Sequence, residues 1–252
     1  MDKQPVFFCV CSQKGGVGKS TFTILLANWL HYALGHDVLV VDCDAPQWSI
    51  VAQRERELDV LERNDRYKLM MVRLFKRTGR KIWPVVRSTP YEGLQAARAY
   101  FAAGDREADF VLLDLPGTVA APGIFRLLAQ LDHLFIPLKA DKLVVESALS
   151  FARAVDEQLV HNDAHRLKGL HLFWTMVDRR ERTPLYESYG KAFAAFRLPV
   201  LQTQVPYRSR FSKEILDTSG AVGRSTLFPA DRAFAADAAL DALAAEILSL
   251  ME

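Results

Sequence analysis

The chain has 252 residues, half of them hydrophobic, and 32 basic against 30 acidic side chains leave a net charge of +2. This length suffices for one α/β domain with a sizeable core, and since no Pro/Gly/Ser-rich linker divides it, we expect residues 1–252 to form a single domain. The near-neutral balance gives no argument for nucleic-acid binding from bulk charge, and no apolar run has the length of a membrane span or the pattern of a signal peptide.

Apolar runs alternate with helical periodicities along the chain. The runs predict strands near residues 6–12, 38–42, 82–86, 110–114, 133–138, 170–175 and 200–204. The periodic stretches predict helices near residues 19–34, 47–78 with a break, 91–103, 122–130, 143–160, 184–196 and 231–250. Such alternation predicts a three-layer α/β fold, a mostly parallel twisted sheet with helices on both faces. Right-handed crossovers would bring the ends of the strands to one edge.

A glycine-rich loop joins the first predicted strand to the first predicted helix. Residues 14–21 read Lys-Gly-Gly-Val-Gly-Lys-Ser-Thr, and strand, loop and helix in this order are the context of a phosphate-binding loop. Glycines let backbone amides converge on an anion in front of the positive helix end. Lys19 would reach the β- and γ-phosphates, and the Ser20 hydroxyl would bind Mg²⁺. The expected nucleotide-binding residues of the loop are Gly15, Gly16, Val17, Gly18, Lys19, Ser20 and Thr21.

Acidic side chains follow two further buried-strand patterns. Asp42 and Asp44 end the run from Val38, and Asp114 ends the run from Phe110. A triphosphate–Mg²⁺ site needs carboxylates at strand ends close to the phosphate loop. A lone aspartate at a strand end is often a helix cap, but two such motifs beside a phosphate loop favour a metal site.

The loop departs from the general Walker A pattern, because Gln13 stands where that pattern has glycine and a second lysine, Lys14, follows. Lys14 resembles the signature lysine of the deviant-Walker ATPases, the ParA/MinD/nitrogenase iron-protein class. The segments 175–178 and 205–208 are also similar to ParA sequences. One departure is Ala45, which separates Asp44 from the Pro-Gln pair that follows directly in the commoner ParA pattern.

The resemblance implies a homodimer that holds two ATP·Mg²⁺ between its subunits and hydrolyses them slowly. Lys14 would act across the interface, Asp44 would orient the attacking water, and Asp42 and Asp114 would support the metal with Ser20. Thr175 and Pro206 would lie beside the nucleotide, since the segment around Pro206 resembles the one that borders the adenine.

Finer features resemble the ParA-like TraA branch of Bacteroides-type conjugative transposons. They are the segments 41–44, 46–47, 114–118, 140–144 and 224–229. The resemblance implies a cytoplasmic, nucleoid-associated ATPase in DNA partitioning or positioning, or in conjugative transfer of a mobile element. A ParB-like or conjugation-apparatus protein would be a partner.

Basic residues gather in two places although the whole chain is nearly neutral. Eleven basic and five acidic residues lie between Gln53 and Arg87, and a second cluster lies between Arg197 and Arg224. Local charge can bind DNA without sequence preference, although a solvated helix face is the alternative. The DNA-binding candidates are Arg77, Arg80, Lys81, Arg208 and Arg210. The last predicted helix is acidic, which argues against a membrane partner.

Other functions remain open at this stage. An ATP-switched scaffold with a protein cargo and little hydrolysis or DNA binding is the main alternative. A synthetase of the same fold would need a substrate pocket beside the γ-phosphate. A nitrogenase-like electron carrier would need cluster cysteines in the middle of the chain, whereas Cys9, Cys11 and Cys43 lie in or beside early strands and fit reduced core thiols. A GTPase would need an Asn-Lys-x-Asp motif, which the sequence lacks.

Overall fold

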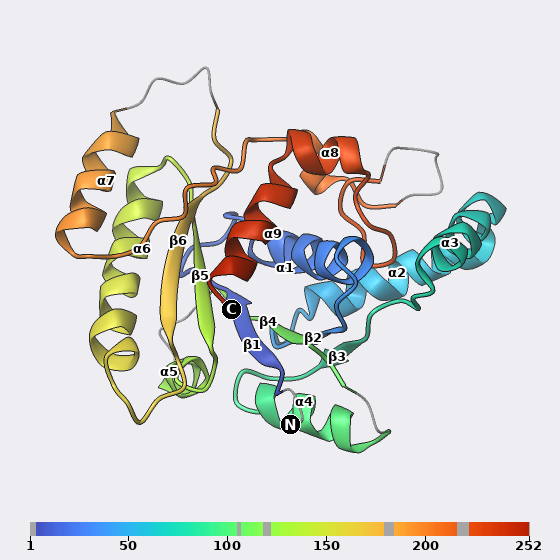
Figure 1. Ribbon diagram of the computed structural model, residues 1–252, viewed down its shortest axis with the longest axis horizontal. Helices are drawn as coiled ribbons and strands as arrows, with labels where there is room; N and C mark the ends of the chain where they lie inside the picture. The colour runs from blue at the N-terminus through green and yellow to red at the C-terminus, as the bar shows by residue number, and fades with distance from the viewer. Residues whose placement is uncertain (1–3, 105–106, 118–121, 179–183, 216–221, 252) are drawn as a thin grey trace.

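The computed structural model describes residues 4–104, 107–117, 122–178, 184–215 and 222–251, and a six-stranded sheet forms its centre (Figure 1). Neighbouring strands all pair in parallel, in the spatial order β3-β2-β4-β1-β5-β6. The strands are β1 (Val6–Val10), β2 (Val38–Asp42), β3 (Val85–Arg87), β4 (Phe110–Asp114), β5 (His133–Leu138) and β6 (Gly169–Trp174). The predicted α/β fold with a parallel sheet is confirmed.

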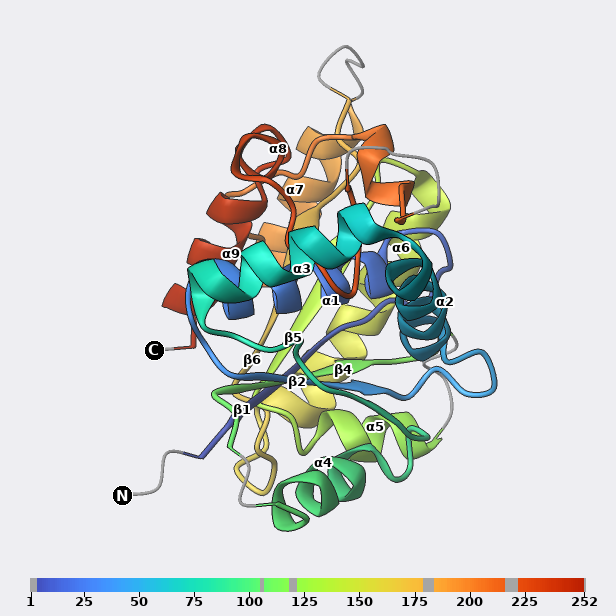
Figure 2. The ribbon, with the colours of Figure 1, turned by 90° about the vertical axis from the view of Figure 1, so that its right-hand side faces the viewer.

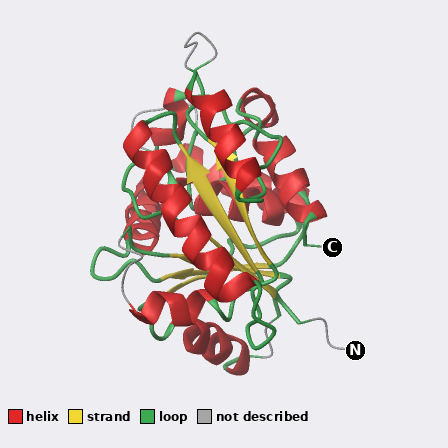
Figure 3. Ribbon diagram, turned by 90° about the vertical axis from the view of Figure 1, so that its left-hand side faces the viewer, coloured by secondary structure: helices red, strands yellow, loops and turns green. Residues whose placement is uncertain are grey.

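Helices connect the strands and cover both faces of the sheet (Figures 2 and 3). They are α1 (Lys19–Asn28), α2 (Ser49–Arg63), α3 (Asp65–Thr78), α4 (Gly93–Ala102), α5 (Pro122–Leu128), α6 (Lys142–Val155), α7 (Leu185–Ala195), α8 (Arg232–Asp237) and α9 (Leu240–Ser249). Two π-helical segments, η1 (Trp29–Ala33) and η2 (Asp156–Val160), extend α1 and α6, and η3 (Ser209–Ser212) is a 3₁₀ turn. The break predicted within residues 47–78 lies at Asn64, whose side chain caps α3.

The sheet divides the hydrophobic interior into two cores. Successive residues of a strand point to opposite faces, so Phe7 and Cys9 of β1 enter one core while Phe8 and Val10 enter the other. Helices α4 to α7 pack on the first face, and α1, α2, α3, α8 and α9 pack on the second. Because both faces are covered, the central strands consist of buried apolar residues rather than alternating ones.

The register brings the acidic strand ends together. Asp42 of β2 lies directly opposite Asp114 of β4, and Asp114 lies opposite Val10 at the end of β1. The glycine-rich loop starts immediately after β1, so the loop and both aspartates occupy the same edge of the sheet, as the sequence predicts.

The predicted seventh strand at residues 200–204 is wrong. The structure has only isolated bridges there, from Leu172 to Val200 and from Val177 to Pro206. Between them the backbone amides of Gln202 and Thr203 bond to the Glu246 carboxylate of α9, at 2.6 and 2.8 Å. The amides of Leu201 and Val205 still donate to carbonyl oxygens of β6, so the pairing is interrupted between them, at the residues that bond to Glu246.

The single helix predicted at residues 231–250 is also wrong, because the chain breaks between α8 and α9. Ala239 has a left-handed backbone, with φ of 53°. In one straight helix the apolar residues of the α8 segment would lie opposite those of the α9 segment, since each residue turns by about 100°. The break turns both apolar faces, including Phe234 and Leu243, into the same core.

Candidate nucleotide-binding site

The loop between β1 and α1 has the backbone geometry of an anion site. Gly16 and Gly18 have left-handed φ values of 77° and 96°, which side chains other than glycine disfavour. A Cβ on Gly18 would also come within 3.0 Å of the Phe22 ring. No side chain caps the start of α1 and no acidic residue lies in its first turn, so its amide groups remain free for an anion.

Neighbouring elements hold this loop in place. The Ser147 hydroxyl of α6 donates to the Gln13 side chain at 3.1 Å, and the backbone amide of Cys11 donates to Phe135 of β5. Thr175, at the end of β6, is buried with its hydroxyl 3.5 Å from the Val17 carbonyl oxygen. Thr175 therefore contacts the back of the loop. Lys14 lies exposed on the loop.

The structure brings Lys19 to the end of β4. A Cβ built on Gly117 would lie 3.3 Å from Lys19 Nζ, so the lack of a side chain at Gly117 leaves room for the ammonium group. The neighbouring Ser20 hydroxyl accepts a hydrogen bond from Ser49 at the start of α2, at 3.4 Å. The predicted phosphate residue Lys19 thus lies beside the segment after β4, and the predicted metal residue Ser20 beside the start of α2.

Asp114 is the most unusual carboxylate of the site. It is fully buried, and neither of its oxygens makes a hydrogen bond of good geometry within the described residues. The pKa of Asp114 is raised to about 7, first by burial and then by the carboxylates of Asp42 and Asp44, while Ser20 and the Lys19 charge act in the opposite direction. A buried carboxylate left without a partner beside a serine hydroxyl fits a Mg²⁺ site, because hard cations prefer oxygen ligands.

Asp42 has a structural task that sequence patterns do not reveal. Its buried carboxylate accepts hydrogen bonds from the amides of Ile50 and Val51 at 2.9 and 3.0 Å, and from the Asp44 amide at 3.2 Å. Burial raises the pKa of Asp42, while these three amides lower it. Asp42 therefore anchors the start of α2, which lacks a side-chain cap of its own. Its support of a metal stays a prediction.

Asp44 lies half-buried after β2 and faces Lys19. Burial raises the pKa of Asp44, and the Lys19 charge lowers it. Its carbonyl oxygen accepts the amides of Gln47 and Trp48, which closes the turn that contains the additional Ala45. The Trp48 indole donates to Ser88 at 2.8 Å, so the turn is fixed against the segment after β3.

Arg224 is a site residue that sequence reasoning missed. Its guanidinium donates to the Thr21 hydroxyl in the first turn of α1 at 2.9 Å and pairs with Glu214. Glu214 also pairs with Arg56 of α2 at 3.1 Å. In the sequence, Arg224 stands out only as a member of a basic cluster. Its contact with Thr21 cannot be predicted there, because the two residues are 203 positions apart.

Replacing Arg224 by alanine is expected to weaken ATP binding about tenfold, the size of one lost charged hydrogen bond that orders the first turn of α1. Isothermal titration with ATP·Mg²⁺ measures this. Arg56→Ala is the matched control, because it removes a partner of Glu214 without touching Thr21. Equal affinities of the two variants would contradict a positioning role for Arg224.

Pro206 is buried beside the end of β6, on the isolated bridge with Val177, and the amide of the following Tyr207 donates to the Val177 carbonyl at 3.0 Å. Its contact with an adenine stays a prediction.

The DNA-binding candidates differ in how their charges are used. Arg80 pairs with Asp37 at 2.8 Å, Arg208 pairs with Asp237, and Arg210 pairs with Asp231 at 2.6 Å. Arg77 and Lys81 are exposed and form no ion pair within the described residues. In three of the five candidates, an acidic side chain of the same chain therefore compensates much of the positive charge.

In the part of the chain that the structure describes, no group of three or more His, Cys, Asp and Glu side chains could hold a metal ion. Across the same ranges, no helix has the length and apolar character to cross a membrane.

Comparisons with known proteins agree with this geometry. The family model of the CobQ/CobB/MinD/ParA nucleotide binding domain matches residues 8–221. A plasmid partition protein from Borrelia burgdorferi B31 bound to AMPPNP covers 98% of both chains, with a TM-score of 0.59 and 18% identity. Cobyrinic acid a,c-diamide synthase from Mycobacterium smegmatis, with bound ATP analogue and magnesium, covers 82% of this chain and 86% of its own, with a TM-score of 0.51 and 21% identity. At these identities the likeness establishes the shared fold.

An iron-sulfur cluster carrier protein from Bacillus subtilis (strain 168) is 34% identical over 124 residues, which are 46% of this chain. The chain spans about a third, 34%, of the length of that relative. Cys9, Cys11 and Cys43 are free and buried in or beside β1 and β2, where they pack in the core. None of them is presented at the surface as a cluster ligand would be.

Proposed function

Because the chain belongs to the CobQ/CobB/MinD/ParA nucleotide binding domain family, we propose that it is an ATPase that binds ATP·Mg²⁺ and forms a homodimer around the nucleotide. The observation that carries the proposal is Asp114, a fully buried carboxylate without a hydrogen bond of good geometry in the described chain, next to Lys19 and Ser20 at a glycine loop. The AMPPNP bound by the partition protein of similar fold supports the choice of an adenine nucleotide.

The loop residues would bind and orient the nucleotide. The free amides at the start of α1 and the Lys19 ammonium hold the phosphates, while Ser20 and Asp114 hold Mg²⁺. When bound, Mg²⁺ neutralises charge on the β- and γ-phosphates. Asp42 keeps the start of α2, and with it Ser49, against Ser20. Thr175 and Pro206 border the nucleotide in this proposal.

Two residues are assigned to hydrolysis. Asp44 lies half-exposed beside Lys19 and orients the attacking water. Lys14, exposed on the loop, reaches the nucleotide of the partner subunit and stabilises charge in the transition state, as an arginine finger does.

In the cell, the protein would partition or position DNA, or a transfer complex, for a mobile element such as a conjugative transposon. Non-specific DNA and a ParB-like or conjugation-apparatus protein are the proposed partners. The plasmid partition protein of similar fold supports this class of role.

An ATP-switched scaffold that binds a protein cargo is the second candidate. The internal ion pairs of Arg80, Arg208 and Arg210 favour it, because paired guanidinium groups have less charge to offer a phosphate backbone. Single-turnover ATP hydrolysis, measured with and without DNA, distinguishes the two. Hydrolysis that DNA accelerates supports the partition role, and ATP-dependent dimers without measurable hydrolysis support the scaffold.

Asp44→Ala is expected to form a dimer with ATP that persists, because the variant binds nucleotide but hydrolyses it at least about a hundredfold more slowly. Lys14→Ala is expected to bind ATP yet to lose hydrolysis and to dimerise weakly. Size-exclusion chromatography with light scattering, run with ATP and with ADP, separates the two variants. A wild type that stays monomeric with ATP, together with an Asp44→Ala variant that is no more dimeric, would disprove the switch.

DNA binding is expected to require the ATP dimer and to fall steeply with salt, since affinity comes from counterion release. Arg77→Glu combined with Lys81→Glu should weaken it at least about tenfold, because dimerisation doubles each lost contact. These two residues test the surface better than Arg80, whose loss would also break its pair with Asp37.

The measurement is fluorescence anisotropy of the Asp44→Ala dimer on two unrelated duplexes at several salt concentrations. Arg126→Glu is the control, an exposed arginine of α5 on the opposite face of the sheet. Strong sequence preference, or no binding at low salt, contradicts the DNA role and favours a protein cargo.

A further inference from the structure

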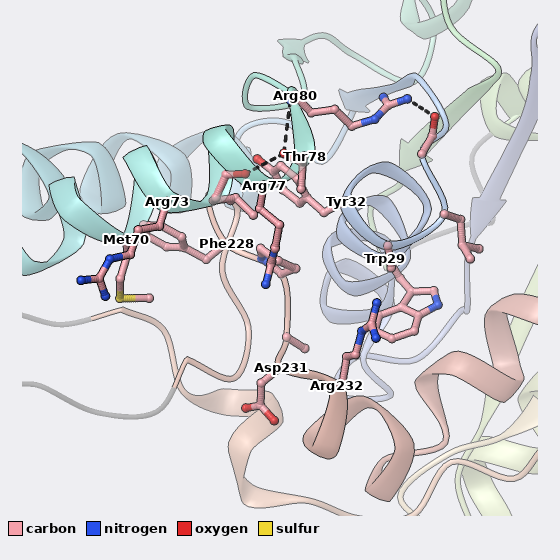
Figure 4. A pocket seen from close by; sticks show the side chains of 16 residues that line it. Trp29, Tyr32, Met70, Arg73, Arg77, Thr78, Arg80, Phe228, Asp231 and Arg232 are labelled. Carbon is pink, nitrogen blue, oxygen red and sulfur yellow. Dashed lines mark hydrogen bonds between the residues drawn. The ribbon is translucent and has the colours of Figure 1, made fainter.

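A second cavity lies away from the phosphate loop, between η1, α3 and the segment that leads into α8 (Figure 4). Its volume is about 910 Å³, at the upper end of the range of small-molecule sites. The cavity begins where α1 passes into η1. Since the phosphate loop lies at the other end of this continuous helix, at Lys19, ten residues at 1.5 Å each place it about 15 Å from the start of the cavity at Trp29.

The cavity carries concentrated positive charge. Arg73 and Arg77 project from successive turns of α3, and Arg232 comes from the start of α8 on the other side (Figure 4). None of the three forms an ion pair or hydrogen bond within the described residues. The two other charged groups of the lining are neutralised, since Arg80 pairs with Asp37 and Asp231 pairs with Arg210.

The remaining walls are apolar and aromatic. The half-buried Trp29 is the first residue of η1, and Tyr32 of η1 and Phe228 lie deeper beside it. The Tyr32 hydroxyl is already used, because it donates to the Leu227 carbonyl at 3.1 Å. Tyr32 and Phe228 are buried, so among these three side chains the half-exposed Trp29 offers its ring surface to a ligand. Such a surface suits a planar ring.

We propose that this cavity binds a phosphorylated ligand with a planar ring, of the nucleotide class, as a second site separate from the phosphate loop. Guanidinium groups match phosphate geometry through paired hydrogen bonds. Three exposed guanidinium groups without protein partners line this cavity, and together they favour an anionic ligand. A diphosphate carries several charges within a few ångströms, whereas an acidic peptide spreads one charge over each residue.

The test uses the Lys19→Ala protein, so that the phosphate loop does not compete for the probe. Isothermal titration compares ADP, pyrophosphate and adenosine, and Trp29 fluorescence reports on the cavity. ADP is expected to bind saturably, one per chain, at least fivefold more tightly than pyrophosphate or adenosine, because only ADP combines phosphates with a ring. Replacing Trp29 by phenylalanine should remove most of the fluorescence change.

Arg232→Glu and Arg77→Glu, each added to Lys19→Ala, are expected to weaken ADP binding at least tenfold. Arg63→Glu is the matched control, because it reverses an exposed arginine of α2 outside the cavity. Arg232 is not among the DNA-binding candidates, so its effect is separable from that proposal.

Three outcomes overturn the inference. They are ADP binding that Arg232→Glu leaves unchanged, no saturable binding of ADP, and tighter binding of an aspartate-rich tryptophan peptide or of a single-stranded oligonucleotide than of ADP. In the second case, retained ATP binding by the wild-type protein would show that the cavity assignment failed while the proposed ATPase site did not.

Discussion

Replacing Lys19 by alanine is expected to reduce the affinity for ATP·Mg²⁺ at least about a hundredfold, because two charge-assisted hydrogen bonds to phosphate are lost from a partly buried site. The Lys19 ammonium group has space at the end of β4, because Gly117 has no side chain there. No neighbouring cation of the described loop can replace it, because Lys14 is exposed on the outer part of the loop.

Isothermal titration with ATP·Mg²⁺ gives the affinities, and circular dichroism verifies that the variant folds. Lys191→Ala is the control, because Lys191 makes only an exposed ion pair with Glu187 on α7. An affinity for ATP equal to that of the control would show that the phosphate loop does not bind the nucleotide. It would also contradict the proposed ATPase.

The predicted part of the site rests on local features. Gly16 and Gly18 were expected to shape an anion site, and their left-handed backbone provides it. The buried strands were predicted from continuous apolar runs, and the parallel register then brought Asp42 and Asp114 side by side. Short-range patterns and the rules of chain connection thus suffice for the fold and for bringing the candidate site residues to one edge of the sheet.

The features that the sequence did not predict depend on partners far along the chain. Glu246 accepts the amides of residues 202–203 where a seventh strand is predicted, and Arg224 reaches Thr21 across 203 positions. The basic clusters show the same limit. Counting charges in the sequence could not reveal that Arg208 and Arg210 face acidic residues near α8.

Two buried aspartates of this protein should respond to the same substitution with opposite signs. Asp114 has no hydrogen-bond partner of good geometry among the described residues, whereas Asp132 accepts the Phe7 amide and the Arg166 guanidinium, each at 2.8 Å. A buried charge without partners costs stability, and the same charge with partners contributes to it. The contrast distinguishes Asp114, whose carboxylate we propose binds a ligand, from Asp132, whose carboxylate stabilises the fold.

Asp114→Asn is therefore expected to stabilise the metal-free protein above pH 7. Burial raises the pKa of Asp114 to about 7, above its ordinary value of 3.8. Both folded and unfolded chains hold the proton below pH 3.8, so the penalty is absent there; it grows as the pH rises and is complete above 7. Its full size is on the order of 4 kcal/mol. Since the buried amide also lacks partners, the net gain should be about 1–3 kcal/mol.

Chemical unfolding between pH 5 and 8.5, with a chelator present, measures this difference. The wild type should lose stability relative to Asp114→Asn across this range, whereas Asp132→Asn should be destabilised by about 3 kcal/mol because Arg166 then lacks its partner. In a second series without the chelator, added ATP·Mg²⁺ should stabilise the wild type and have little effect on Asp114→Asn, because the amide cannot replace the carboxylate as a metal ligand. Equal stabilisation of both by ATP·Mg²⁺ would show that Asp114 does not hold the metal, and the energetic cost of burying it would then need another cause.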